Sequence, residues 1–218
     1  MKQFLLSLFA ITLLFAACQK EQLTVIQNAD ESVFIKNGEL TRVLMSVSAH
    51  DGSFDDNLDQ ASCFSINFPY EIILNGEPYQ VNSPTDLEII TPTDTIWPVY
   101  PITLTLADHS TRELTHIEQY FSLKTQCDSG ILFSDLITCV DLQYPFSMAV
   151  FDPVANDFTT IVMAHDSETF THMSDLQEDN EVSINFPIRL SFPNGTTVTI
   201  NSHNQLLERI LAAVSNCN

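Results

Sequence analysis

Residues 63–69 read Cys-Phe-Ser-Ile-Asn-Phe-Pro, and most of this run returns near the end of the chain, where residues 183–187 read Ser-Ile-Asn-Phe-Pro. Both runs are rich in residues that favour strands, and both end in an aromatic residue followed by proline. Proline has no backbone N–H to donate, so within a sheet it marks an edge or a bulge rather than a central position. The two runs therefore predict that one type of strand is used at least twice in the fold.

The residues after each run also correspond. Asn75-Gly76 follows the first run and Asn194-Gly195 the second, each between β-rich stretches, and Asn-Gly in that setting is the strongest short signal for a hairpin. Ser83 and Ser202 come next and are favourable residues at the N-cap of a helix. Gln205, three residues after Ser202, completes a capping box. We therefore expect a hairpin followed by a helix at both places.

Two further aromatic–proline pairs suggest weaker copies of the same unit. Tyr100-Pro101 and Tyr144-Pro145 begin strand-like stretches that lead into helical ones. The sequence thus predicts four units of two strands and a helix, which pair because a lone unit cannot cover its sheet. The expected fold class is α+β, with a tandem repeat that forms two related domains, residues 63–127 and 139–217, each with antiparallel sheets.

Residues 37–62 precede the first unit and are expected to form a helix and an Asp-rich connector. Apolar residues at positions 40, 43, 44 and 47 follow the period of an amphipathic helix. The connector carries side-chain oxygens of the kind that bind Ca²⁺. They belong to Asp51, Ser53, Asp55, Asp56 and Asp59. No Glu closes an EF-hand at the twelfth position, so turns and helix caps in a solvated loop are the favoured interpretation.

Residues 1–17 are predicted to be a lipoprotein signal peptide. A basic start precedes an apolar run that is too short to span a membrane as a mature helix, and small residues stand directly before Cys18. This pattern resembles a bacterial lipobox, which implies cleavage before Cys18 and its acylation, and residues 18–36 then form a lipid-anchored tether. An ordinary signal peptide with a nearby cysteine is the alternative. Gln19-Lys20-Glu21 resembles the tag of surface-exposed lipoproteins in Bacteroidetes-type bacteria, which implies the outer membrane or the cell surface as the location.

The four cysteines that remain follow the predicted duplication. Cys63 and Cys139 each stand six residues before a proline, and Cys127 and Cys217 each follow the last helix of a pair of units. The duplication predicts the disulfides Cys63–Cys127 and Cys139–Cys217, one in each domain, and an exported protein retains such bonds. The alternative pairs Cys127 with Cys139 and Cys63 with Cys217. No two cysteines have the Cys-x-x-Cys spacing of a redox or zinc site.

Several of these motifs together resemble a family of uncharacterised lipoproteins from Bacteroidetes-type bacteria. They are Cys63–Pro69, Asn194-Gly195, Ile200–Ser202 and the preceding His50–Phe54. The resemblance covers most of the mature chain and implies an envelope location and a modular construction. It supplies no activity and no catalytic residue.

The charge of the chain excludes one class of partner. It has 28 Asp and Glu residues against 8 Lys and Arg, a formal net charge of −20. Nucleic acids bind to basic stripes, so a nucleic-acid partner is not expected. The sequence also lacks Gly-x-Ser-x-Gly, Gly-x-Gly-x-x-Gly and the P-loop, so no nucleophile or nucleotide site is indicated.

The histidines offer a candidate site for a transition metal. His109 and His116 are seven residues apart, as are His165 and His172, and His116 and His172 stand in similar local sequences. With neighbouring aspartates they could bind Zn²⁺ or another transition metal. Inheritance from a common unit explains the spacing equally, and no metal is the favoured interpretation.

The aromatic residues offer a candidate binding surface. Trp97, Tyr100 and the aromatics before the prolines suit a sugar or peptide ligand, although core positions are the favoured interpretation. We therefore expect a non-enzymatic, membrane-anchored envelope lipoprotein with a binding or structural role and no cofactor. Its expected partners are the membrane, through the anchor, and an envelope protein or a surface polymer, with a proline-marked strand edge as one place for a partner strand. The alternative is a secreted hydrolase or a metal-dependent enzyme.

Overall fold

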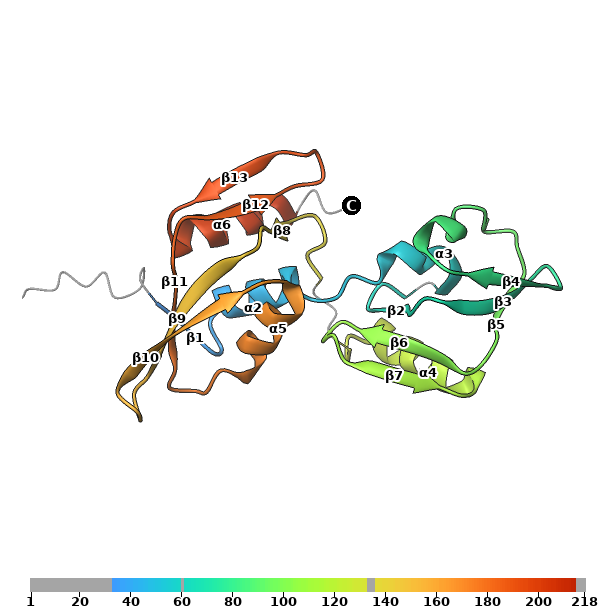
Figure 1. Cartoon of the computed structure of the whole chain (residues 1–218), viewed down its shortest axis with the longest axis horizontal. Coiled ribbons are helices and arrows are strands. Elements are labelled where there is room, and N and C mark those ends of the chain that lie inside the picture. The colour runs from blue at the N-terminus through green and yellow to red at the C-terminus, as the bar shows by residue number, and fades with distance from the viewer. Residues whose placement is uncertain (1–32, 60, 133–135, 215–218) are drawn as a thin grey trace, which may run out of the picture. The chain divides into compact units, whose positions relative to one another are not determined.

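The computed structural model describes residues 33–59, 61–132 and 136–214 and shows an α+β fold of antiparallel sheets and helices (Figure 1). The predicted signal peptide, Cys18, most of the tether and Cys217 lie outside the described residues. Within these ranges no helix is both long enough and apolar enough to cross a membrane.

The described chain begins with a short strand, β1 (Phe34–Ile35), and the predicted amphipathic helix, α2 (Glu39–Val47). The four apolar positions that predicted this helix are all buried. Strand β1 pairs with a strand from the far end of the chain, β11 (Glu181–Ile184), and α2 lies beside α5 (Asp166–Asp175) (Figure 1). The N-terminal segment is thus part of the C-terminal hydrophobic core, to which it contributes Phe34, Leu40 and Leu44.

Residues 64–128 form two small antiparallel sheets around one core. The elements are β2 (Phe64–Ile66), β3 (Tyr70–Leu74), β4 (Glu77–Val81), the 3₁₀ helix η2 (Pro84–Leu87), β5 (Ile96–Pro98), β6 (Ile102–Leu106), β7 (Thr111–Leu114) and α4 (Ile117–Asp128). The strand orders are β2-β6-β7 and β4-β3-β5. Side chains from both sheets and from α4 share this core, among them Phe64, Ile72, Leu104 and Leu123, which are almost or completely buried.

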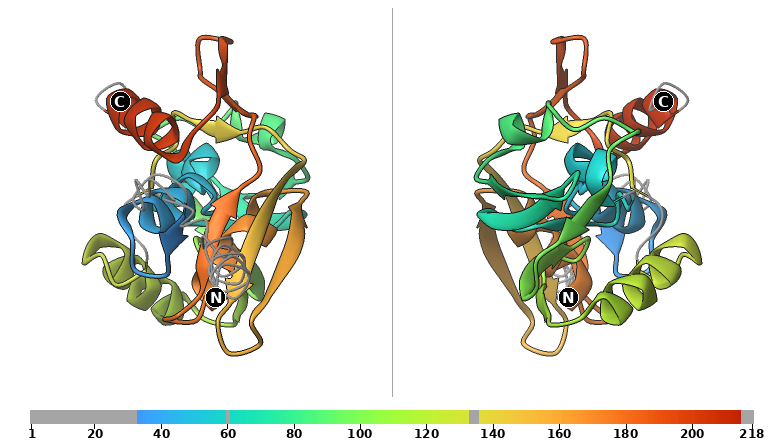
Figure 2. Two further views of the ribbon diagram at one scale, coloured as in Figure 1. Left: turned by 90° about the vertical axis from the view of Figure 1, so that its left-hand side faces the viewer. Right: turned by 90° about the vertical axis from the view of Figure 1, so that its right-hand side faces the viewer.

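Residues 141–214 form the other pair of sheets. The elements are β8 (Asp141–Leu142), β9 (Phe146–Asp152), β10 (Asp157–Met163), α5, β11, β12 (Ile188–Ser191), β13 (Thr197–Ile200) and α6 (His203–Val214). The strand orders are β13-β12-β8 and β1-β11-β9-β10. Figure 2 shows α6 beside the β12–β13 hairpin, and Leu206 and Ile210 of this helix join the core with Leu190 and Ile200 of the hairpin.

The two segments use the same pattern of strand pairing. In the first, β6 pairs with β2 and β7, and β3 pairs with β4 and β5. In the second, β12 pairs with β8 and β13, and β9 pairs with β10 and β11. The four aromatic–proline bonds are all cis and stand directly before β3, β6, β9 and β12. Each is followed by two strands and then a helix, although η2 is only one 3₁₀ turn.

The repeated Ser-Ile-Asn-Phe-Pro run has a structural role in both places. Its isoleucines, Ile66 and Ile184, are buried and lie at the end of β2 and of β11. The backbone N–H of each isoleucine donates a hydrogen bond to a buried side chain. Asp55 Oδ2 accepts the N–H of Ile66 at 2.8 Å, and His203 Nε2 accepts the N–H of Ile184 at 3.0 Å. A buried N–H without an acceptor costs about 1–3 kcal/mol, so these bonds stabilise the strand ends.

The asparagine of each run extends the pairing by one residue. The backbone N–H of Asn67 donates to the carbonyl of Thr103 at 2.8 Å, and that of Asn185 donates to the carbonyl of Ser147 at 2.9 Å. The side chains of these asparagines also hydrogen-bond to the same neighbouring strands. The run is therefore explained by strand pairing and needs no reaction.

The Asp-rich connector differs from the expected solvated loop. It folds into a 3₁₀ turn, η1 (Ser53–Asp55), and a short helix, α3 (Asp56–Asp59), and the side chain of Asp55 is 0% exposed. Gly52 packs so closely that a Cβ atom there would lie 2.1 Å from the carbonyl oxygen of Phe64. The expected turns and caps are present, since Asp51 Oδ1 accepts the backbone N–H of Ser53 and both residues are exposed. The expectation was wrong for Asp55, which is buried and accepts the backbone N–H of Ile66.

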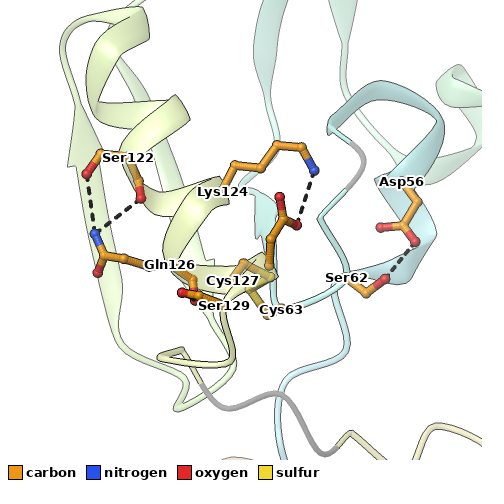
Figure 3. The surroundings of a disulfide bond; sticks show 9 residues. Asp56, Ser62, Cys63, Ser122, Lys124, Gln126, Cys127 and Ser129 are labelled. Atoms are coloured by element: carbon orange, nitrogen blue, oxygen red, sulfur yellow. Dashed lines mark hydrogen bonds and ion pairs between the residues drawn. A yellow bond between two sulfur atoms is a disulfide. The ribbon is translucent and has the colours of Figure 1, made fainter.

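The structure contains the disulfide Cys63–Cys127, which joins the start of β2 to the end of α4 (Figure 3). The bond spans a sequence separation of 64 residues, for which the loop-entropy model gives a stabilisation of about 4 kcal/mol. This pairing excludes the alternative in which Cys63 pairs with Cys217. Cys139 is also disulfide-bonded, but Cys217 lies outside the described residues, so the second predicted bridge stays a prediction.

Candidate functional site

The four candidate metal-binding histidines do not come together. His109 lies in the turn between β6 and β7, His116 and His165 are the N-cap residues of α4 and α5, and His172 lies inside α5. The similarity between the surroundings of His116 and His172 was therefore misleading, since His165 is the residue at the corresponding helix start. In the described part of the chain, no three His, Cys, Asp or Glu side chains are arranged to hold a metal ion.

The predicted aromatic surface is present in part. Trp97 on β5 is 56% exposed and Phe121 on α4 is 55% exposed, and both line one hollow of about 180 Å³. The favoured core position was thus wrong for Trp97. Tyr100 does pack partly against the core, where burial, followed by the nearby Glu118 carboxylate, raises the pKa of its hydroxyl.

The exposure of these two rings follows from the elements that carry them. Strand β5 is the edge of its sheet, and the Trp97 side chain has no further strand beside it. Helix α4 turns Tyr120 and Leu123 into the core, which leaves Phe121 on the outer side. Both rings therefore stand at the rim of a hollow that the core does not fill.

The lining of this aromatic hollow is mostly apolar. It consists of Leu58, Ile96, Trp97, Pro98, Ile117, Tyr120, Phe121 and Lys124. Lys124 carries the only charged group in the lining, and its ammonium lies 3.5 Å from the carboxylate of Asp128. A hollow with exposed aromatic walls and few polar groups is suited to an apolar side chain of a partner.

A second exposed apolar area lies on the β9–β10 hairpin. Phe158 and Val162 on β10 are 69% and 61% exposed, and Val154 at the turn is 86% exposed. Strand β10 is an edge strand, and it contains neither proline nor lysine, the residues that commonly protect such edges. The expected acceptor for a partner strand was a proline-marked edge, but this expectation was wrong, because the prolines of the four aromatic–proline pairs directly precede β3, β6, β9 and β12, which are inner strands of their sheets. Each proline stands just before its strand, where it removes no ladder hydrogen bond. The longest edge strand among the described residues, β10, is free of proline.

Two histidines meet just after α2. The ring centroids of His50 and His109 lie 5.9 Å apart. His109 Nε2 donates to the backbone carbonyl of Ser48 at 2.7 Å, and His50 Nε2 lies 2.7 Å from the hydroxyl oxygen of Ser65. Burial lowers the pKa of His50 and the neighbouring His109 lowers it further, while Asp51 acts in the opposite direction. His50 is therefore neutral at pH 7.

The contact between Ser65 and His50 resembles a nucleophile and its base, but the surroundings exclude that role. Ser65 is 2% exposed and lies on β2, paired with β6, so a substrate cannot reach its oxygen. The contact instead ties the connector to the sheet. Sequence reasoning missed it because the two residues are 15 positions apart and belong to no common motif.

Another hollow, of about 630 Å³, lies between the β12–β13 hairpin and α6. Its lining is mainly apolar, with Arg209 as the one charged side chain. No acid–base pair or nucleophile faces it, so its chemistry indicates no reaction.

Comparisons with models of protein families, with curated proteins and with solved structures find no match to this chain. The functional argument therefore depends on the residues and the geometry of the chain itself.

Proposed function

We propose that this protein is an exported, lipid-anchored protein of the bacterial cell envelope that binds a partner protein and catalyses no reaction. The observation that carries the binding role is the pair of exposed rings, Trp97 and Phe121, over one apolar hollow. Tryptophan and other aromatic side chains dominate the energetic centres of protein interfaces. Exposed apolar patches of this kind mark sites of interaction with another molecule. We therefore propose that a partner covers the two rings.

The proposed location depends on the N-terminal sequence and on the cysteines. The apolar run before Cys18 has the features of a lipoprotein signal peptide, and acylation of that residue would hold the protein at a membrane. The disulfide Cys63–Cys127 supports export, because such bonds persist in oxidising compartments. Replacement of Cys18 by alanine should release the protein into the soluble fraction, and unchanged membrane association would refute the anchor.

We also propose that the chain consists of two related domains, residues 63–127 and 139–217. The identical pairing of six strands in each segment and the matching positions of the aromatic–proline pairs support a duplication. Separate expression of residues 61–132, followed by amide exchange, tests whether this part folds alone. Loss of protection throughout that fragment would contradict an independent domain.

The chemistry of the hollow favours a protein partner over a glycan. A sugar needs several hydrogen bonds to its hydroxyl groups, whereas the hollow offers Lys124 as its only charged group. The net charge of −20 in addition favours a partner with a basic surface, since opposite potentials speed association. The partner we propose therefore presents an apolar anchor residue within a basic surface.

The single tryptophan of the chain provides a direct test. Candidate partners captured from envelope extracts should change the emission of Trp97 on binding, and Trp97→Ala or Phe121→Ala should weaken binding at least tenfold. Phe158→Ala is the matched control, since it removes an exposed aromatic ring from β10, away from the hollow. Equal binding by all three variants would refute the assignment, and an emission change with neutral oligosaccharides alone would assign the hollow to a glycan instead.

A further inference from the structure

A small polar pocket lies where α2 ends, separate from the aromatic hollow. Its volume is about 130 Å³. The walls come from the last turn of α2, from His50-Asp51, from the β6–β7 turn, from residues 136–141 and from the start of α5. Segments far apart in the sequence thus converge on one space.

Ser46 is the polar group in this pocket that lacks a protein partner. Its side chain is 5% exposed, and its hydroxyl oxygen has no hydrogen-bond partner among the described residues. A buried hydroxyl without a partner costs about 1–3 kcal/mol. A polar ligand or water in the pocket would satisfy it, because Ser46 lines that space.

The charge of the pocket selects a cation. Its acidic side chains are Asp51, Asp141 and Asp166, and its lining contains no lysine or arginine. The C-terminal end of α2 adds the negative end of a helix dipole. Burial raises the pKa of Asp141, and the carboxylates of Asp166 and Asp51 raise it further, so both lie close enough to repel the Asp141 carboxylate.

Hydrogen bonds already hold two of these carboxylates and leave one oxygen of each available. Tyr144 donates its hydroxyl to Asp166 Oδ1 at 2.7 Å. The backbone N–H of Ser53 donates to Asp51 Oδ1 at 2.8 Å. Two of the three acidic side chains in the pocket are therefore held in place by hydrogen bonds.

From these observations we infer that the pocket binds one hydrated hard divalent cation, Mg²⁺ or Ca²⁺. Both ions prefer oxygen ligands, and Mg²⁺ in particular keeps several of its waters and binds through one or two carboxylates. Since no three acidic or imidazole groups of the described residues converge on one point, waters complete the shell. A volume of about 130 Å³ holds roughly four waters at ~30 Å³ each, enough for an ion that retains part of its shell.

Isothermal titration with MgCl₂ and CaCl₂ at constant ionic strength tests this site. The expected result is one cation per chain with a dissociation constant on the order of 10⁻⁴–10⁻³ M, as in extracellular calcium modules. The double variant Asp141→Asn/Asp166→Asn should bind at least tenfold more weakly. Asn at position 166 still accepts from Tyr144, so the pocket keeps its shape.

The control must separate a site from general attraction to an acidic protein. The double variant Asp157→Asn/Asp175→Asn removes the same charge from two exposed positions and should bind as the natural protein does. Ser46→Ala keeps every charge and should weaken binding several-fold, so it also decides the question if the first double variant does not fold. Absence of one-to-one binding, or equal weakening in the control, would overturn the site.

Discussion

The variant Asp55→Asn is expected to be more stable than the natural protein at pH 8 and to lose part of its pH dependence. Asp55 is 0% exposed, and its Oδ2 accepts the N–H of Ile66 at 2.8 Å. Its other oxygen, Oδ1, is buried without a hydrogen-bond partner among the described residues. Burial raises the pKa of this carboxyl to about 7 from an ordinary value of 3.8, aided by the nearby Asp56 and opposed by the Ile66 N–H.

The sign of the pH effect follows from the proton count. The pKa of Asp55 is higher in the folded than in the unfolded protein, so between these two values the folded state binds more protons. The free energy of unfolding therefore falls as the pH rises from about 4 to about 7 and stays low above that range. At about 1.4 kcal/mol per pKa unit, ionised Asp55 costs roughly 4 kcal/mol at pH 8.

Asparagine removes that cost while it keeps the shape and the acceptor for Ile66. Its NH₂ group then takes the place of Oδ1 without a partner, which costs about 1–3 kcal/mol. The net gain at pH 8 is thus expected to be about 1–3 kcal/mol. Asp55→Ala also removes the charge, but it leaves the Ile66 N–H without an acceptor, so it should be less stable than Asp55→Asn at every pH.

Urea unfolding of the three proteins at pH 4.5, 6 and 8 measures these differences. The curve for the natural protein should approach that of Asp55→Asn as the pH falls, because protonated Asp55 no longer carries a buried charge. A natural protein that is more stable than Asp55→Asn at pH 8, or a gap that does not change between pH 4.5 and 8, would refute the reasoning.

Three further variants test the fold. Replacing Cys63 and Cys127 together by serine should lower the free energy of unfolding by about 4 kcal/mol, measured by urea denaturation, and a loss below about 1 kcal/mol would contradict a strongly constraining bridge. Gly52→Ala places a methyl group 2.1 Å from the carbonyl oxygen of Phe64 and should lower the free energy of unfolding by at least about 2 kcal/mol in the same assay. Unchanged stability would contradict this close packing. Val162→Lys on the edge strand β10 should leave stability within about 0.5 kcal/mol but reduce self-association in concentrated samples, measured by sedimentation, and equal association by both proteins would show that this edge does not pair.

The elements that the sequence predicted correctly are those that local chemistry determines. Asn75 and Gly76 both have positive φ angles, as a tight hairpin turn requires, and Gly195 does too. Ser83 and Ser202 do cap helices, with Gln205 donating to the hydroxyl of Ser202 through its backbone N–H. In each case the signal and its structural consequence lie within a few residues of one another.

The features that the sequence did not reveal depend on contacts between distant segments. Nothing in the order of residues indicates that Asp55 is completely buried while Asp51 is exposed. The exposure of Trp97 depends on its place at a sheet edge, and an aromatic residue in a short β-rich run is compatible with either face. The polar pocket around Ser46 was likewise invisible, because it requires segments from several parts of the chain to converge.

The two Ser-Ile-Asn-Phe-Pro runs show how one fold requirement is met by different residues. In both, the isoleucine N–H at a strand end needs a buried acceptor, yet the first copy uses Asp55 from the preceding connector and the second uses His203 from the following helix. Nε2 of His203 can accept only while the ring is neutral, whereas Asp55 accepts in both protonation states. The backbone thus fixes the need for an acceptor at this strand end and leaves the chemistry of the acceptor open.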